Sequence, residues 1–327
     1  MLPLVHLPDP VLDVLLDKLD YISAQSLRKV CHRFRNLIDQ QKPKNFKRAL
    51  EKVLITVGDF SVKFQFSCEN EEITVNYQNE EDGCSVNACR KKELENPTLH
   101  EKSLKNENYL DTFYNDFILF LKFYNREISD LVIKFETNNI ELLEKFPKVS
   151  NLKTEFLCLE RFDQYQLMTV LPPIEASQIY IDCFNIEENV EYEEFMELDT
   201  WKNGRELRLR NGYSTAPLQN FIHFKKVDIL RREVTAADLL FLKETFLRDP
   251  TLEFYKIGFR VMNPSNLLEQ VFGHPLVFTA RFRMNRKMWF FRLQDRSKVL
   301  VIRLFTEWFD LERVDVTTIP QSAVVQY

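Results

Sequence analysis

The sequence predicts a protein of the α+β or α/β class, in which a small helical module precedes a large curved β-sheet. Three observations carry this prediction: two helical segments near the N-terminus, four alternating strand-like segments after them, and a recurring strand–helix pattern in the second half. We expect a helical module at residues 1–44, a linker helix with an antiparallel meander at residues 45–108, and a repeat domain at residues 109–327. A chain of 327 residues is long enough for two domains or for one elongated array.

The first helical segment, "LPDPVLDVLLDKLD", is apolar on an unusually wide arc. Asp9 can cap the helix, and Pro10 suits the first helical position because its missing N–H costs nothing there. The aliphatic residues cover about 200° of the helical wheel, against the roughly 100° stripe of an ordinary surface helix. They are Val11, Leu12, Val14, Leu15, Leu16 and Leu19. This helix therefore has a second apolar flank that needs a cover.

The second segment, "SAQSLRKVCHRFRNLI", has a single apolar face. Ser23 is a good N-cap, and Ile22 and Leu27 stand where a hydrophobic staple would form. We therefore predict one helix from Ser23 to Ile38 that buries one side. A linker and a short helix are expected in the following "QQKPKNFKRALEKV".

Four alternating segments then predict an antiparallel meander. They are "LITV", "SVKFQFS", "EITVNYQ" and "CSVNACRK", and they are separated by polar turn residues. A polar stretch at residues 91–108 follows, and "YLDTFYNDFILFLKFY" predicts a long helix after it.

Strand-like segments recur through the second half, each followed by a helix-like stretch. They are "DLVIKF", "NLKTEF", "SQIYID", "RELRLR", "KKVDIL" and "EFYKIGF". Aligning them at Ile133, Thr154, Ile181, Leu209, Ile229 and Ile257 gives steps of 20 to 28 residues. These steps resemble the 20–29-residue period of leucine-rich repeats, although the asparagine of that consensus is absent. We therefore predict irregular leucine-rich-like units whose parallel strands form a curved sheet. The segment "FTARFRMNRKMWFFRLQDRSKVLVIRLF" predicts strands with a turn near Gln294–Ser297, which would close the open edge of that sheet.

Composition argues against an enzyme. The six glycines form neither dinucleotide-binding nor phosphate-binding loops, the six cysteines lack zinc spacing, and no nucleophile elbow occurs. We expect no catalytic residue, metal or cofactor. His223, which lies between aromatic residues, is best explained as a structural histidine. No apolar run has the length of a bilayer span, so we expect an intracellular protein without a membrane partner, cytoplasmic, nuclear or both.

The stretch "LPDPVLDVLLDKLDYISAQSLRKVCHRFRNLID" resembles an F-box. The resemblance implies docking onto the linker subunit of SCF-type cullin ubiquitin ligases, which belongs to the S-phase kinase-associated protein family, and through it onto a cullin. Such docking would cover the second flank of the first helix. Phe34 stands where many F-boxes carry Trp. The expected contact residues are Leu7, Pro8, Val11, Leu12, Leu15, Leu16 and Leu19.

The second half is similar to the FTH domain that follows the F-box in the nematode-expanded F-box A family. Four blocks in order carry this resemblance, from about residue 117 to about residue 260: "VLPPIEASQIYID", "MELDTWKNGRELRLR", "LQNFIHFKKVDI" and "VTAADLLFLKETFLRDPTLEFYKIGF". The resemblance implies a substrate-recognition adaptor without catalytic activity, whose second half binds an unknown protein target.

Strand alternation suggests where the target would bind. If Leu207 and Leu209 face the core, Arg208 and Arg210 point outward. The neighbouring strands place further polar residues on the same side, so the candidate target-binding set is Tyr180, Arg208, Arg210, Asp228 and Lys256. A solvated sheet face without a partner is an equally open interpretation.

A second hypothesis is an F-box-containing RNA-, ribonucleoprotein- or protein-binding module that does not act in ubiquitination. Residues 281–303 mix eight basic side chains with Trp289, Phe290 and Phe291, a composition found in platforms for single-stranded RNA. The same segment also alternates as ordinary core would, with Phe282, Met284, Met288, Phe290 and Leu293 inward. Because the whole chain is slightly acidic, nucleic acid is not the expected partner.

Overall fold

The computed structural model describes most of the chain in two compact units. The described residues are 7–16, 27, 31–40, 51–68, 71–92, 96–123, 127–137, 144, 152–183, 189–190, 195–263, 267–279 and 285–326. The first unit comprises residues 1–156 with 173–175, and the second comprises residues 157–172 with 176–327. The division into three domains that the sequence suggests stays a prediction.

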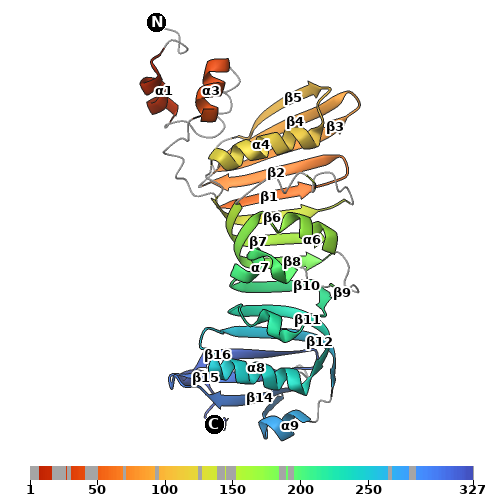
Figure 1. Cartoon of the computed structure of the whole chain (residues 1–327), viewed down its shortest axis with the longest axis vertical. Helices are drawn as coiled ribbons and strands as arrows, with labels where there is room; N and C mark the ends of the chain where they lie inside the picture. The colour runs from red at the N-terminus through yellow and green to blue at the C-terminus, as the bar shows by residue number, and fades with distance from the viewer. Residues whose placement is uncertain are drawn as a thin grey trace. The chain divides into compact units, whose positions relative to one another are not determined.

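Two helices form the described part of the N-terminal region, α1 (Asp9–Leu16) and α3 (His32–Gln40) (Figure 1). The helix α1 starts one residue earlier than expected, because the Pro8 carbonyl accepts hydrogen bonds from the N–H groups of Val11 and Leu12. Cys31 is not helical, and its carbonyl accepts from Arg35, so the predicted single second helix is interrupted there. The predicted start of that helix at Ser23, and residues 41–50 of the predicted linker, lie outside the described residues.

The first unit contains the predicted antiparallel meander. Its strands are β1 (Lys52–Val57), β2 (Ser61–Cys68), β3 (Glu71–Glu80) and β4 (Gly83–Lys92), each antiparallel to the next. A further strand, β5 (Thr98–Lys105), pairs antiparallel with β4. It lies in the polar stretch of residues 91–108, where the sequence predicts no strand. All of its residues except Leu104 are exposed, so it has no buried side that alternation could reveal.

Aromatic packing holds the predicted long helix, α4 (Tyr109–Phe123), on this sheet. Phe113, Phe117 and Phe120 of α4 lie edge-on to Phe64 of β2, with ring centroids 4.9 to 6.0 Å apart. On the other side of β1 lies β6 (Glu127–Phe135), which is parallel to it. Four of the 28 phenylalanines of the chain therefore pack in this core.

The second unit is built on four parallel strands in sequence order. They are β8 (Ile174–Cys183), β10 (Glu206–Ser214), β11 (Lys226–Thr235) and β12 (Phe254–Asn263), and they contain four of the strand-like segments expected from the sequence. Helical segments join them: η3 (Phe195–Glu197), α7 (Asp199–Asn203), η4 (Leu218–Phe221) and α8 (Ala236–Arg248). The two-residue strand β9 (Asn189–Val190) extends along the end of β10. Two other expected segments lie in β6 and in β7 (Leu152–Phe162), which is followed by α6 (Gln164–Val170). Their description as leucine-rich-like repeats stays a prediction.

C-terminal strands cover the edge of this parallel sheet. They are β13 (Leu276–Thr279), β14 (Asn285–Arg292), β15 (Lys298–Leu304), β16 (Trp308–Asp315) and β17 (Val325–Gln326), with α9 (Leu267–Phe272) and η5 (Val316–Thr318) beside them. The strand that pairs with β12 is β16, in the antiparallel sense, and β15, β14 and β13 follow outward in that order. The predicted turn between β14 and β15 is confirmed.

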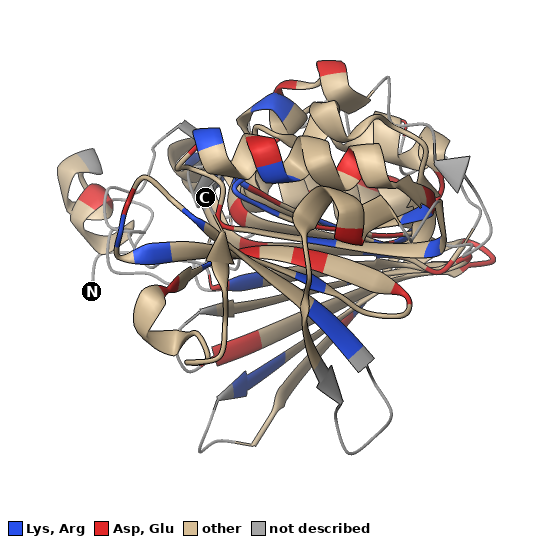
Figure 2. Cartoon of the chain, turned by 90° about the horizontal axis from the view of Figure 1, so that it is seen from below, with Lys and Arg blue, Asp and Glu red and all other residues tan. Residues whose placement is uncertain are grey.

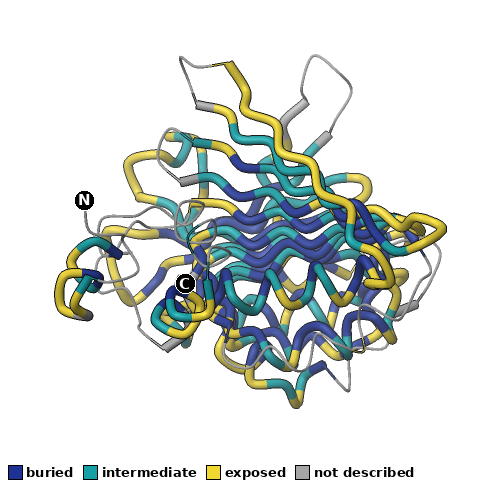
Figure 3. The backbone as a smooth tube through the Cα atoms, turned by 90° about the horizontal axis from the view of Figure 1, so that it is seen from above, coloured by how far each residue is buried: buried dark blue, intermediate teal, exposed yellow. Residues whose placement is uncertain are grey.

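The two faces of this sheet bury different residues. One face packs on helices, where Phe246 of α8 meets Tyr255 of β12 edge-on at 5.1 Å. By strand register, the opposite face carries Lys256 and its cross-strand neighbours. At the far end of that opposite face lies a second small core, formed by Met288, Phe290, Val299 and Val301 under Ile319, Ala323 and Val325. Figure 3 shows the buried stretches in the middle of the strands and exposed residues at the loops.

We predict that Tyr255 makes the second unit sensitive to alkaline pH. Its hydroxyl lies 2.6 Å from the Phe221 carbonyl, and burial raises its pKa well above the ordinary value. Above about pH 10, the unfolded chain therefore loses a phenolic proton that the folded chain keeps, and the free energy of unfolding falls. Tyr255→Phe should cost about 1 kcal/mol at neutral pH. The gap between the two proteins in urea titrations should then shrink above pH 10, whereas parallel curves would contradict this assignment.

Candidate interaction surface

A row of charged and aromatic residues crosses the sheet of the second unit, one residue per strand. The paired residues, in order, are Tyr180, Arg208, Asp228, Lys256, Asp310 and Arg303, on β8, β10, β11, β12, β16 and β15. Directly paired residues point to the same face of a sheet. The structure thus brings four of the candidate target-binding residues together as immediate neighbours.

The fifth candidate, Arg210, lies one step along β10 on the same face, opposite Asp182 of β8. The Nε atom of Arg208 and the Nη2 atom of Arg210 each lie 3.9 Å from the same carboxylate oxygen of Asp228. At that distance neither contact is a hydrogen bond. Both arginine side chains are more than half exposed (57% and 52%), whereas Asp228 is 20% exposed. The positive groups therefore stand further into solvent than the carboxylate they share.

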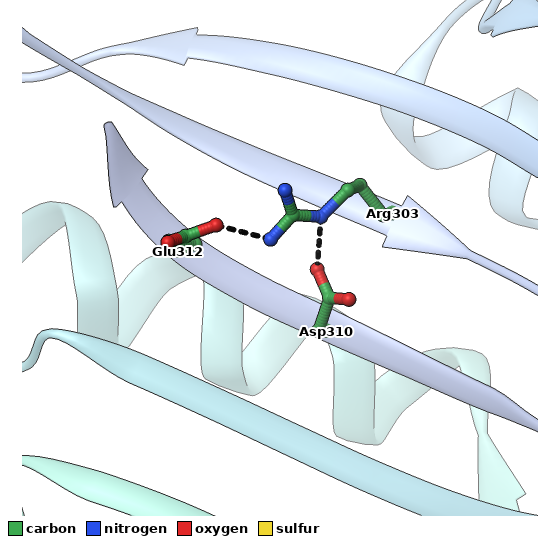
Figure 4. Close-up of polar contacts among 3 residues, drawn as sticks. All are labelled: Arg303, Asp310 and Glu312. Carbon is green, nitrogen blue, oxygen red and sulfur yellow. Dashed lines mark hydrogen bonds and ion pairs between the residues drawn. The ribbon is translucent and has the colours of Figure 1, made fainter. Parts of the chain in front are cut away.

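Arg303 anchors the other end of the row between two carboxylates (Figure 4). Its Nε donates to Asp310, and its Nη2 donates to Glu312. Asp310 is only 7% exposed, and burial raises the pKa of its carboxyl, while the hydrogen bond from Arg303 opposes that rise. Asp310 and Arg303 are not among the residues expected from the sequence, because their place in the row depends on the pairing of β16 with β12. Figure 2 marks the charged positions of both signs along the strands.

An aromatic pair borders the row. Phe305 and Trp308 stack with ring centroids 4.5 Å apart, and the Lys256 ammonium lies 5.6 Å from the Trp308 ring. The pair is only half-buried. Leu230 lies between this pair and the arginines, and it covers Gly258, where an added Cβ would meet its Cδ2 atom at 2.4 Å. Apolar surface thus continues from β11 to β16 on the face that carries the row, which we call the charged face.

The expected ligase-contact residues divide by burial. Leu12 and Leu16 are buried, Pro8 and Val11 are exposed, and Leu7 and Leu15 are intermediate, while Leu19 lies outside the described residues. Val14, which was not in the expected set, is the more exposed of the two valines of α1, at 59%. The wide apolar arc of the sequence therefore corresponds to one buried side and one exposed side of α1.

The aromatic residues of the basic C-terminal segment are buried. Trp289, Phe290 and Phe291 are each at most 3% exposed, so they do not form an open stacking platform. Met288, Phe290 and Leu293 are buried, as alternation predicted, whereas Phe282 and Met284 lie outside the described residues.

The remaining polar candidates have structural partners. A ring nitrogen of His223 lies 3.0 Å from the Trp201 carbonyl, and burial lowers the pKa of this histidine. Among the described residues, no three His, Cys, Asp or Glu side chains are grouped as metal ligands would be. Within the same residues, no helix combines the length and the apolar character that crossing a bilayer requires.

Comparison with known proteins assigns two regions of the chain. Residues 4–46 match the F-box domain, and residues 137–275 match the FTH domain. The FTH match begins and ends later than the resemblance seen in the sequence. No curated protein and no solved structure matches the chain.

F-box domains typically bind the SCF linker subunit and, through it, a cullin. Here the F-box match includes both α1 and α3, and the FTH match includes β8, β10, β11 and β12. The chain is therefore an F-box protein with a C-terminal FTH domain, the architecture of the F-box A family.

Proposed function

We propose that this protein is a substrate-recognition adaptor of an SCF-type cullin ubiquitin ligase. The F-box would bind the linker subunit through the exposed side of α1, and the charged face of the second unit would bind a protein target. The pairing of an F-box with a separate unit that presents outward-facing charged and aromatic residues supports this proposal most directly.

The adaptor would act by proximity. Holding a target near the charged ubiquitin carrier raises the effective concentration of the target lysines at the reacting thioester. F-box proteins are generally non-catalytic, and we propose that this chain likewise has no active site of its own.

Affinity capture from cells with the proteasome inhibited tests the proposal. Recovery of the linker subunit, a cullin and an accumulating protein would support the adaptor function. Recovery of a partner without linker subunit or cullin would instead support a protein-binding module outside ubiquitination. RNA that survives high salt would support the ribonucleoprotein alternative.

We predict that Tyr180→Ala combined with Arg208→Glu removes the captured target. Both side chains lie on the charged face, and Arg208 is mostly exposed, so the melting temperature should change by only a few degrees. Linker-subunit recovery should be unaffected, because α1 does not include these residues. Arg248→Glu, at an exposed position of α8 outside both candidate surfaces, is the matched charge-reversal control.

A competing surface gives the opposite result. If the double variant keeps its target and neutralising Arg283, Arg286 and Arg292 removes it, the target binds the basic C-terminal segment. The charged face would then be a solvated sheet surface.

A further inference from the structure

One end of the charged face favours an anionic group. Arg208 and Arg210 stand further into solvent than Asp228, which both of them approach at 3.9 Å. The nearby Asp182 is half-buried and accepts a hydrogen bond from the Asn211 amide at 2.5 Å. A partner therefore meets the guanidinium groups before the carboxylates beneath them, and guanidinium groups bind carboxylates through paired N–H donors.

The other end favours an apolar group. Trp308 and Phe305 form a stacked, half-buried surface, and Leu230 extends it over Gly258. Lys256 lies over the Trp308 ring and near Asp310. A half-buried tryptophan with apolar neighbours and a polar border is the kind of site that anchors a partner side chain.

Strand geometry sets the distance between the two ends. From β10 to β16 there are three strand intervals, through β11 and β12. At about 4.8 Å per interval this amounts to about 14 Å. An extended chain advances about 3.3 Å per residue, so about four residues cover that distance.

We infer that the target segment is an extended stretch lying across the strands, with an acidic side chain on Arg208 and Arg210 and an apolar side chain on Trp308, about four residues apart. This inference rests on the proposed function, and it adds the chemistry of the partner to it.

Fluorescent synthetic peptides test the spacing and the charge. Each peptide carries one Glu and one Leu, separated by one to eight positions in a Gly/Ser background, and binding to the full-length chain is followed by anisotropy. The tightest binding is expected at a separation of about four, with an affinity roughly tenfold lower at separations of one and eight. Replacing the Glu by Lys should lower the binding affinity by a similar factor.

Protein variants show which residue of the peptide binds at each end of the charged face. Arg208→Gln with Arg210→Gln should remove the preference for Glu over Lys while leaving the preference for Leu over Ser. Trp308→Ala should remove the preference for Leu over Ser while leaving the preference for Glu over Lys. Arg208→Glu with Arg210→Glu should prefer the Lys peptide, a reversal that loss of folding cannot produce. Arg248→Gln, at an exposed position of α8 outside both surfaces, should behave like the wild type.

Three outcomes would overturn the inference: no peptide binds, binding does not depend on separation, or Lys and Glu peptides bind equally. Each of these leaves the adaptor proposal standing if Tyr180→Ala with Arg208→Glu still loses the cellular target. If that variant keeps its target, the proposed binding face itself is wrong.

Discussion

Replacing Val14 with Asp is expected to weaken linker-subunit binding by at least about 100-fold while α1 stays folded. Val14 is 59% exposed, so the free F-box tolerates a carboxylate there. In the complex the same carboxylate would be buried without a partner, which costs more than the roughly 2–7 kcal/mol of an unpaired neutral polar group. Each 1.4 kcal/mol lowers the affinity about tenfold. Titration calorimetry with purified linker subunit measures the effect.

Two further variants separate docking from folding. Asn36→Asp places the same added charge at an exposed position of α3 and should leave the affinity nearly unchanged. Leu12→Asp should also abolish binding, but by unfolding the helix pair, because Leu12 is completely buried. If Val14→Asp binds as tightly as the wild type, the exposed side of α1 is not the docking surface.

Replacing Arg313 with Met is expected to lower the melting temperature of the second unit by on the order of 10 °C. From β16, its guanidinium donates to the carbonyl groups of Phe246, Asp249 and Leu252, at and just after the end of α8. The last carbonyls of a helix have no partner within the helix, so this one side chain satisfies several of them. Leaving buried carbonyls without a donor costs about 1–3 kcal/mol each. A loss of several kcal/mol corresponds to about 2–4 °C per kcal/mol in a unit of this size.

Controls show whether the hydrogen bonds or the charge is responsible. Arg248→Met removes an exposed arginine from the last turn of α8 and should shift the melting temperature by only about a degree or two. Arg313→Lys keeps the charge but has no planar fork, so it should recover only part of the stability. If Arg313→Met melted like Arg248→Met, the guanidinium contacts would contribute little.

The alternation of apolar and polar residues along each strand was sufficient to predict the part of the row on β8, β10, β11 and β12. Aligning the strand-like segments on their buried aliphatic residues placed Ile181 with Leu209 and Ile229 with Ile257, and these are the observed cross-strand pairs. Because strand register fixes which side chains share a face, the outward residues followed from the inward ones. Whether that face binds a target stays a prediction.

Features that depend on backbone pairing between strands, rather than on the residue pattern of one strand, could not be predicted in this way. The strand β5 has no buried side, and its place is set by backbone pairing with β4. Asp310, Arg303 and Trp308 join the charged face only because β16 returns to pair with β12. No local pattern in β16 states which earlier strand it will meet. Trp289 and Phe291 are buried together with Met288 and Phe290, because both faces of β14 are covered.

The pairing of β16 with β12 has a consequence during synthesis on the ribosome. After Asn263 emerges, β12 can pair with β11, but its other edge stays open until β16 (residues 308–315) follows. The strands between them, β13, β14 and β15, pair among themselves or with β16. At about 5–20 residues per second, that interval lasts a few seconds. An open strand edge of this kind is a template for pairing with other chains. The yield of folded protein should therefore depend on chaperones that shield the nascent chain, and slower translation between these two strands should lower it.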